Sequence, residues 1–176
     1  PFHHDAAAIK PDKANTQNFT LGVSFGATRE VEFQYAGERK DKTSPVISFD
    51  LKDNEPQSGQ FTIDMNSTWS DDERLTKHLK AEDFFDVENY PESKFVATNF
   101  SKGSEGKYEL SGNLTLRGVT KNITFPTQVT HNNNSVILKA EFDINRQDFG
   151  ISYAGKVDDL IRDEVIIKLN LIAQSQ

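Results

Sequence analysis

The sequence predicts an all-β protein, with one curved antiparallel sheet and a single short helix. Three observations support this fold class. Apolar and polar residues alternate along roughly eight or nine segments, which is the period of strands with one buried face. Turn-forming clusters such as AGERKDKTSP and THNNNS separate these segments, and links this short favour antiparallel neighbours. The second face of almost every segment is polar, so the solutions are a sandwich or a closed barrel with water outside.

The expected strands follow one another along most of the 176 residues. Residues 1–17 show no period and are interpreted as a tail or linker, which leaves 18–176 as one domain. Residues 94–101 are apolar on both faces, and Gly112 predicts a bend or bulge in its strand. The other segments have one apolar face, formed by Phe19, Leu21, Val23 and Phe25; Val31, Phe33 and Tyr35; Ile47, Phe49 and Leu51; Phe61, Ile63 and Met65; Leu110, Leu114 and Leu116; Val119, Ile123, Phe125 and Val129; Val136, Leu138, Ala140, Phe142 and Ile144; and Val165, Ile167, Leu169 and Leu171.

The helix is predicted from the stretch SDDERLTKHLKAEDFF, residues 70–85. Ser70 followed by Glu73 has the spacing of a capping box, with Ser70 as the N-cap. Leu75 and Leu79 form a narrow apolar stripe, which Phe84 and Phe85 continue beyond the helix. A stripe of two leucines is too narrow to hold a helix across a broad sheet, so we expect the helix to seal the end of a barrel.

Composition restricts the classes of partner. The net charge is −7 and no Lys/Arg cluster offers a phosphate footprint, so no nucleic-acid partner is expected. There is no cysteine, and no apolar run approaches the roughly 18 residues of a membrane span. Thirteen Phe against four Tyr and one Trp suit either a dry packed core or a cavity that receives hydrocarbon.

No catalytic set stands out in the sequence. It has neither the His-Glu-x-x-His pattern nor a phosphate-cradling glycine loop. His78 with Glu82 one turn later is a candidate general base, but a solvent-facing helical histidine is the simpler interpretation. The terminal His3 and His4 could meet a metal, although such pairs are usually adventitious. We therefore expect no enzyme, no metal site and no required cofactor.

Arg146 is the one charged residue that follows an apolar row. It continues the inward face of residues 136–144, where a guanidinium without a partner would be very costly. It must therefore lie at a rim, pair with an acid such as Asp148, or meet the polar head of a ligand. Pairing with an acid would make an arginine–aspartate clamp that holds the end of a barrel.

Three stretches, KHLKAEDFFDVENYPESKF, LSGNLTLRGVTKNITFP and FDINRQDFGISYAG, together resemble the YceI-like, polyisoprenoid-binding family of bacterial proteins. The resemblance covers roughly residues 58–173, and GQFTIDMNST is similar to the strand that precedes the helix in this family. The front strands, FTLGVSFGATREVEFQY, keep the alternation but lack the His-x-Gly of many members. The resemblance implies a lipocalin-like antiparallel barrel of about eight strands with a helix beside it and a long apolar tunnel.

The same resemblance implies binding of long-tailed isoprenoid quinones or polyprenyl lipids, without catalysis, in the periplasm or outside the cell. The chain opens at Pro1 without a charged or apolar leader, so either a signal peptide has been removed or the chain has been trimmed. The expected partner is an amphiphilic isoprenoid, with transient membrane contact and a homodimer that shields the entrance. The rival hypotheses are a side-chain-filled barrel that acts as an interaction or stress module, and an enzyme that uses His78.

The expected ligand-binding residues are the inward residues of the barrel, together with the two phenylalanines after the helix. Arg146 is expected at the mouth, with Asp148 as its partner. The residues are Phe61, Ile63, Met65, Phe84, Phe85, Phe95, Leu114, Leu116, Ile123, Phe125, Leu138, Phe142, Ile144, Arg146, Val165, Ile167 and Leu169.

Overall fold

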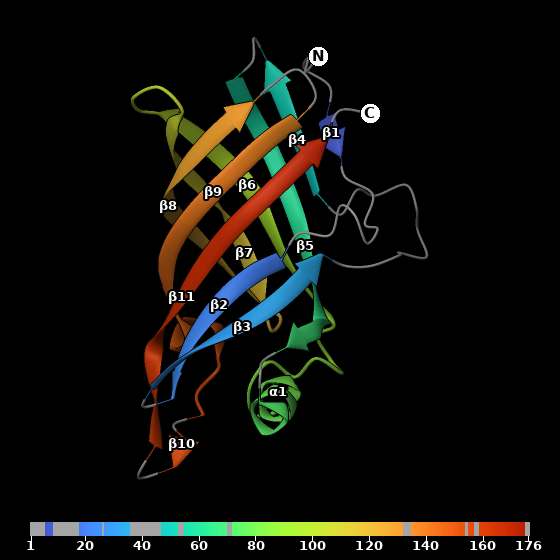
Figure 1. Ribbon diagram of the computed structural model, residues 1–176, viewed down its shortest axis with the longest axis vertical. Helices are drawn as coiled ribbons and strands as arrows, with labels where there is room; N and C mark the ends of the chain where they lie inside the picture. The colour runs from blue at the N-terminus through green and yellow to red at the C-terminus, as the bar shows by residue number, and fades with distance from the viewer. Residues whose placement is uncertain are drawn as a thin grey trace.

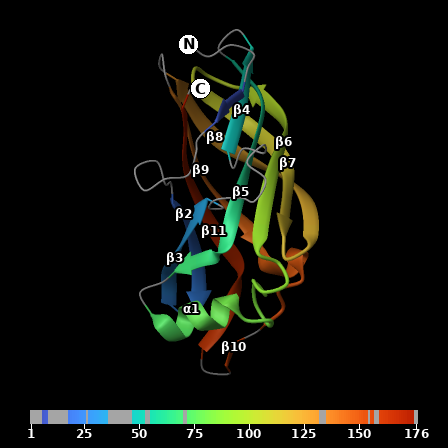
Figure 2. The same ribbon diagram turned by 90° about the vertical axis from the view of Figure 1, so that its right-hand side faces the viewer.

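The computed structural model describes residues 6–8, 18–25, 27–35, 47–52, 55–69, 72–131, 135–153, 155–156 and 159–174. In this part of the chain, long strands wrap around one axis, and the α-helix lies at one end (Figures 1 and 2). The elements are β1 (Ala6–Ala8), β2 (Asn18–Phe25), β3 (Ala27–Tyr35), β4 (Ile47–Lys52), β5 (Glu55–Trp69), α1 (Glu73–Lys80), β6 (Glu92–Lys102), β7 (Lys107–Leu116), β8 (Val119–His131), β9 (Ser135–Asn145), the 3-10 helix η1 (Arg146–Phe149), β10 (Gly155–Lys156) and β11 (Asp159–Gln174).

The sheet closes on itself through β5. The strand order is β1-β4-β5-β3-β2-β11-β9-β8-β7-β6, and β6 also pairs with β5. Each of these pairings is antiparallel. The predicted antiparallel barrel with one short helix is therefore confirmed. Within the described residues the sheet contains 11 strands instead of about eight, and the additional ones include β1 and β10, which are too short to show a period.

β1 lies within the segment that the sequence predicts to be a tail. Ala6, Ala7 and Ala8 pair with Asp50, Phe49 and Ser48 of β4, respectively. The remainder of residues 1–17, including the histidine pair at positions 3 and 4, lies outside the described residues. Three consecutive alanines have no alternation, so this strand depends on pairing with β4 and could not be predicted from periodicity.

The helix α1 begins at Glu73, with Asp72 as its N-cap. The Asp72 Oδ1 atom accepts hydrogen bonds from the backbone N–H groups of Arg74 at 2.9 Å and Leu75 at 3.4 Å. The predicted capping box with Ser70 as the N-cap is therefore wrong, and Ser70 itself lies outside the described residues. A carboxylate at this position satisfies free N–H groups and also opposes the positive end of the helix dipole, which favours it over serine.

The buried face of α1 is as narrow as the leucine spacing predicts. Leu79 is fully buried and Leu75 is partly buried, and the helix contacts β5 at one end of the barrel. Phe84 and Phe85 follow in the next turn and are also buried. We call the end of the barrel that carries α1 the helix end. No helix in the described residues is long and apolar enough to cross a membrane.

The structure explains why residues 94–101 are apolar on both faces of the strand. The register of β6 against β7 shifts between Ala97 and Asn99, so an extra residue changes which parity faces inward. Phe95 is buried before the shift, and Phe100, of opposite parity, is partly buried after it. The irregularity lies in β6, opposite Gly112, and Gly112 itself stays in register with both neighbouring strands. The predicted bulge was therefore assigned to the wrong strand.

Gly112 has a different role, which is to make room for a ring. A Cβ atom at Gly112 would lie 2.2 Å from Cζ of Phe95 and 2.7 Å from the backbone oxygen of Val96. The Phe95 ring therefore lies directly over the glycine.

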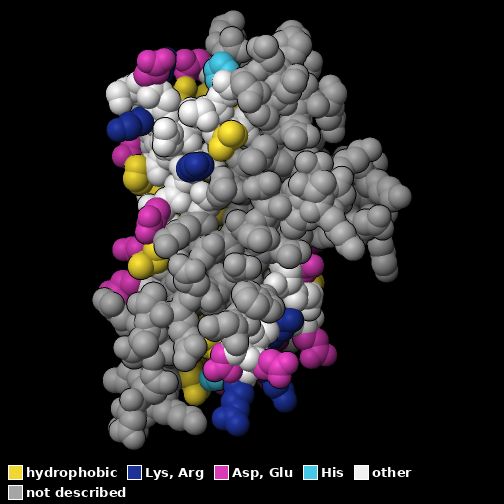
Figure 3. Space-filling model, viewed as in Figure 1, with side chains coloured by type: hydrophobic (Ala, Val, Ile, Leu, Met, Phe, Trp, Pro, Cys, Tyr) yellow, Lys and Arg dark blue, Asp and Glu magenta, His cyan; other side chains and the backbone are white. Residues whose placement is uncertain are grey.

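On the outside of the barrel, basic and acidic side chains are interspersed over the described part of the face in Figure 3.

Candidate functional site

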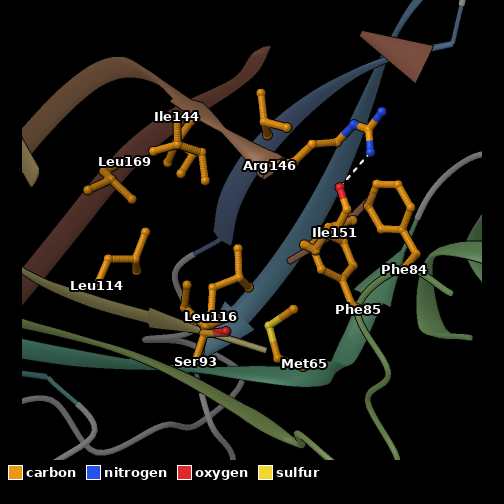
Figure 4. A pocket seen from close by; sticks show the side chains of 13 residues that line it. Met65, Phe84, Phe85, Ser93, Leu114, Leu116, Ile144, Arg146, Ile151 and Leu169 are labelled. Atoms are coloured by element: carbon orange, nitrogen blue, oxygen red, sulfur yellow. Dashed lines mark hydrogen bonds between the residues drawn. The ribbon is translucent and has the colours of Figure 1, made fainter. Parts of the chain in front are cut away.

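The helix end of the barrel contains an apolar cavity of about 50 Å³. This volume is small compared with the roughly 300–1,000 Å³ of typical ligand pockets. Its walls come from β5, the segment after α1, β6, β7, β9, η1 and β11, and the surface that faces the cavity is apolar (Figure 4). The lining residues are Ile63, Met65, Phe84, Phe85, Ser93, Leu114, Leu116, Ile144, Arg146, Ile151, Val165, Ile167 and Leu169.

Most residues predicted to line a tunnel surround this cavity, and sequence reasoning missed two. The missed residues are Ser93 and Ile151. Ser93 is polar and begins a strand of ambiguous facing, and Ile151 follows η1 in a segment without a period, so neither gave a signal. The predicted residues found in the lining are Ile63, Met65, Phe84, Phe85, Leu114, Leu116, Ile144, Arg146, Val165, Ile167 and Leu169.

Four of the other predicted residues form a stack of rings across the barrel, which we call the phenyl stack: Phe61, Phe95, Phe125 and Phe142. The ring centroids are 5.2 Å apart for Phe61 and Phe95, and 5.5 Å apart for Phe95 and Phe125. Phe125 and Phe142 lie parallel, with centroids 3.9 Å apart. At this level the rings contact one another, where the resemblance implies an open tunnel.

The remaining two predicted residues are also outside the cavity lining. Leu138 is buried in the core, and Ile123 is partly buried against it. Both therefore have the inward orientation that the alternation predicts, in a part of the barrel that is filled. Alternation reports which face of a strand is inward, and it does not distinguish a wall from a packed interior.

Arg146 is buried at the start of η1, with its side chain 2% exposed. Its Nη1 donates a hydrogen bond of 2.6 Å to the backbone oxygen of Ile151, as Figure 4 shows. Its Nη2 lies 3.4 Å from Oδ1 of Asp163, on β11. Burial lowers the pKa of Arg146, and the charge of Asp163 acts in the opposite direction. The contacts of the guanidinium therefore include a backbone oxygen and a carboxylate.

Asp163 replaces the predicted partner, Asp148. Strand β9 ends at Asn145, whose side chain accepts a hydrogen bond from the Gln147 backbone N–H at 2.9 Å and so caps η1. The turn of η1 leaves the side chain of Asp148 exposed. The neighbouring strand β11 instead supplies the acid. The prediction of an arginine–aspartate clamp holds, but its acidic residue was wrong.

Ser93 is the second polar residue of the cavity lining. Its side chain is 2% exposed, and its Oγ atom has no hydrogen-bond partner among the described residues. In the β5–β6 ladder Ser93 lies opposite Ile63, which also lines the cavity. Ser93 therefore belongs to the cavity wall at the helix end (Figure 4), and its hydroxyl is buried beneath the apolar surface that faces the cavity.

Arg117 joins two segments that close the helix end. Its Nη2 donates a hydrogen bond of 2.6 Å to the backbone oxygen of Glu82, and its Nη1 donates one of 3.2 Å to that of Gly150. These acceptors lie close in sequence to Phe84 and Ile151, which both line the cavity. We call this pair of hydrogen bonds the Arg117 strap.

His78 takes part in packing at the same end. Its ring lies edge-to-face against Tyr153, with centroids 4.4 Å apart, and near Phe84 at 6.3 Å. Its acidic neighbour is Asp83, with Nε2 3.7 Å from Oδ2, instead of the predicted Glu82. No group of three potential metal ligands occurs among the described residues.

The three stretches that carry the family resemblance meet at this cavity. The first runs from α1 into β6 and supplies Phe84, Phe85 and Ser93. The hairpin of β7 and β8 supplies Leu114 and Leu116, and the third stretch, from β9 through η1, supplies Ile144, Arg146 and Ile151. Segments far apart in the chain therefore converge on one site.

Comparison with known proteins identifies the family. The family model described as "YceI-like domain" matches residues 12–173. The chain belongs to the YceI-like family. The recognisable sequence motifs begin at about residue 58, whereas the family match begins at residue 12. The YceI-like domain therefore also includes the strands before residue 58.

Relatives and solved structures agree with this assignment. A UPF0312 protein of Pseudomonas putida strain W619 is 30% identical, over 93% of this chain and 86% of that protein. The crystal structure of Burkholderia cenocepacia BcnA has a TM-score of 0.69 at 23% identity, covering 92% of this chain and 98% of that one. A polyisoprenoid-binding domain from Saccharophagus degradans has a TM-score of 0.68 at 14% identity, covering 97% of this chain and 98% of that one. At these identities the structures establish a shared YceI-like fold.

Proposed function

We propose that this YceI-like protein binds the apolar tail of a long-chain isoprenoid amphiphile inside its barrel, without catalysing a reaction. The observation that carries the proposal is the apolar cavity at the helix end, on which the three family stretches converge. An isoprenoid quinone or a polyprenyl lipid is the expected cargo. The solved relative from Saccharophagus degradans, described as a polyisoprenoid-binding domain, supports this class of ligand.

The energetics of transfer support a tail-binding role. Each apolar carbon that leaves water for the barrel contributes about 0.8 kcal/mol. A tail of about 20 to 40 carbons could therefore exceed the practical affinity limit of about 20 kcal/mol, before the cost of ordering the chain is subtracted. The cavity is smaller than such a tail, so binding must also displace side chains that now fill the barrel.

We place this function outside the cytoplasm, in the periplasm or in the secreted fraction, where a carrier would shield a prenyl tail between membranes. A homodimer that covers the entrance would assist such a role. The absence of cysteine is compatible with this compartment. Fractionation of cells with an antibody against the chain tests the location, and a cytoplasmic signal would contradict it.

One observation favours a second function. The phenyl stack fills the barrel beside the cavity, with Phe125 and Phe142 in parallel contact at 3.9 Å. A barrel closed by its own side chains suits a protein-interaction or stress module that holds no lipid. The two functions differ in whether the interior accepts a tail, and this difference can be measured.

The test begins with the purified protein, extracted with organic solvent and analysed by mass spectrometry. Delipidated protein is then titrated with a prenyl quinone, using quenching of tryptophan fluorescence and a partition assay. Tail binding predicts a co-purifying prenyl lipid or saturable uptake of the quinone. A clean extract together with no uptake contradicts the proposal and favours the filled barrel.

A matched pair of variants locates the site. Leu116→Asn places a polar side chain in the cavity wall, and Val96→Asn makes the same kind of change at a residue that is 37% exposed. The first should reduce uptake about five- to 150-fold, because a buried amide without a partner costs about 1–3 kcal/mol, and the second should leave uptake unchanged. Equal uptake by both folded variants would place binding elsewhere.

A further inference from the structure

Ser93 is an unusual residue for the wall of an apolar cavity. Its hydroxyl is almost completely buried and has no partner among the described residues. A buried hydroxyl without a hydrogen bond is unfavourable, so such a group is normally paired in the state in which it functions. Because the surface that now faces the cavity is apolar, a partner reaches Ser93 from the cavity side only when tail binding displaces the side chains that cover the Oγ atom (Figure 4).

The position of Ser93 shows where that partner would lie. Ser93 is the second residue of β6, at the helix end, and Phe95 is the next inward residue along the same strand. Successive inward residues of a strand are about 7 Å apart. An atom bound to Ser93 therefore lies between the closed helix end and the phenyl stack, and an attached tail extends toward the stack.

The charges at the site indicate which kind of group Ser93 can bind. Arg146 is the one charged residue among the described residues that line the cavity. Its guanidinium is already engaged by the backbone oxygen of Ile151 at 2.6 Å and by Asp163 at 3.4 Å. A phosphate or carboxylate entering the cavity would add a negative charge to a site where the positive charge is already matched, and burial of such a charge is costly.

From these observations we propose that the Ser93 hydroxyl hydrogen-bonds to an uncharged polar group of the bound amphiphile, such as an alcohol, a carbonyl or an amide. The inference rests on the proposed function, because it assigns the head group of the ligand to the same cavity. Ser93 then selects neutral-headed isoprenoids over prenyl phosphates and over plain hydrocarbons. The helix end holds the head, and the barrel interior holds the tail.

The test uses three probes with the same C20 prenyl tail: geranylgeraniol, the corresponding hydrocarbon without the hydroxyl, and geranylgeranyl phosphate. Affinities are measured by displacement of a fluorescent apolar probe. The native protein should bind the alcohol most tightly. Ser93→Ala should weaken binding of the alcohol about three- to tenfold, as expected for one hydrogen bond, and should leave the hydrocarbon unaffected or bound slightly more tightly.

The control is Ser101→Ala, the same change on the same strand at an exposed residue, which should alter no affinity. The melting temperature of ligand-free Ser93→Ala should equal or exceed that of the native protein, because the variant removes an unpaired hydroxyl. A fall in melting temperature would show that the protein itself pairs this group. Equal loss for alcohol and hydrocarbon, or tighter binding of the phosphate, would also overturn the inference.

The outcomes separate this inference from the proposed function. If no probe displaces the fluorophore from the native protein, tail binding itself is wrong. If alcohol and hydrocarbon bind the native protein and Ser93→Ala does not distinguish them, tail binding stands and the role of Ser93 is wrong.

Discussion

For Arg146, the sequence predicted the inward orientation of the side chain but not its acidic partner. Its place after an apolar row of β9 predicted an inward charge at a barrel end, and its side chain is buried there. The choice of acid could not be predicted, because Asp163 comes from β11, which pairs with β9 only in the folded sheet. The nearby Asp148 is exposed after the turn of η1. Local sequence thus predicted the need for a partner, and tertiary pairing selected it.

A pair of isosteric substitutions distinguishes the two acids. Asp163→Asn removes the charge 3.4 Å from the Arg146 guanidinium and should reduce the free energy of unfolding by about 0.5–1 kcal/mol, since Asp163 is itself half-exposed. Asp148→Asn should change it by less than about 0.5 kcal/mol. Urea unfolding at neutral pH measures both, and a larger loss for Asp148→Asn would contradict the observed pairing.

Gly112 provides a second prediction at this scale. In Gly112→Ala, the new methyl would overlap the Phe95 ring and the backbone oxygen of Val96. The strain should destabilise the fold by about 1–3 kcal/mol, measured by urea unfolding. Gly103→Ala is the control, because the nearest atom to its added methyl is 3.5 Å away. Equal stability of the two variants would show that the ring moves aside freely.

Among the elements, the closing segments of the barrel were less predictable than its strands. The alternation of β7 appears directly in the structure, where Tyr108, Leu110 and Leu114 are all buried. The helix was expected, but its cap is Asp72 instead of Ser70. Cap positions depend on one or two local hydrogen bonds, whereas a strand face is set by several residues together, so the strand signal is more robust.

The Arg117 strap predicts how the helix end opens. Arg117 has a positive φ of 50°, so Arg117→Asn keeps a residue that tolerates this backbone conformation and removes the guanidinium. Amide hydrogen exchange should become faster in residues 82–87 and 149–151, and bound tail should dissociate faster. Arg74→Ala, an exposed change on α1, should alter neither. Unchanged exchange after Arg117→Asn would show that the strap does not hold the end closed.

At the opposite end of the barrel, Glu55 connects three strands and makes stability sensitive to alkaline pH. Its carboxylate accepts hydrogen bonds of 2.6 Å from Nζ of Lys102 and from Oη of Tyr108. The hydrogen bond from Lys102, followed by that from Tyr108, lowers the pKa of Glu55. Burial and the hydrogen bond to Glu55 raise the pKa of Tyr108 from 10.0 to about 12.

The pKa of Tyr108 is higher in the folded protein than in the unfolded chain. The contribution of Tyr108 to stability is therefore complete below pH 10 and is lost between about pH 10 and 12. Native protein should therefore lose more stability across this interval than Tyr108→Phe, as measured by urea unfolding at each pH. Tyr90→Phe, at an exposed position, should follow the native curve. Parallel curves for native protein and Tyr108→Phe would contradict the shift.

For the whole molecule, the sequence predicted an antiparallel barrel and a helix at its end, and the structure agrees. The open interior was not predictable in the same way. Phe61 and Phe142 have the same inward orientation as Ile63 and Ile144, yet the first pair belongs to the phenyl stack and the second to the cavity wall. Whether inward rings meet or stand apart depends on the curvature of the sheet, which no single strand encodes.

The phenyl stack predicts a limit on tail length. Native protein should bind prenyl alcohols more tightly with each added carbon, by about 0.8 kcal/mol, until the tail reaches the stack. Phe142→Leu removes one ring of the pair whose centroids are 3.9 Å apart. In this variant the affinity should continue to increase for longer tails. Displacement titrations across a series of chain lengths measure both. Identical length profiles would show that tails pass the rings, or avoid them, without hindrance.

The acceptors of the Arg117 strap are main-chain oxygens, and this has an evolutionary consequence. Any amino acid at position 82 presents the same carbonyl, so substitutions there cannot abolish the contact through side-chain chemistry. Sequence drift in that segment should thus be tolerated, while one codon, that of Arg117, carries the whole interaction.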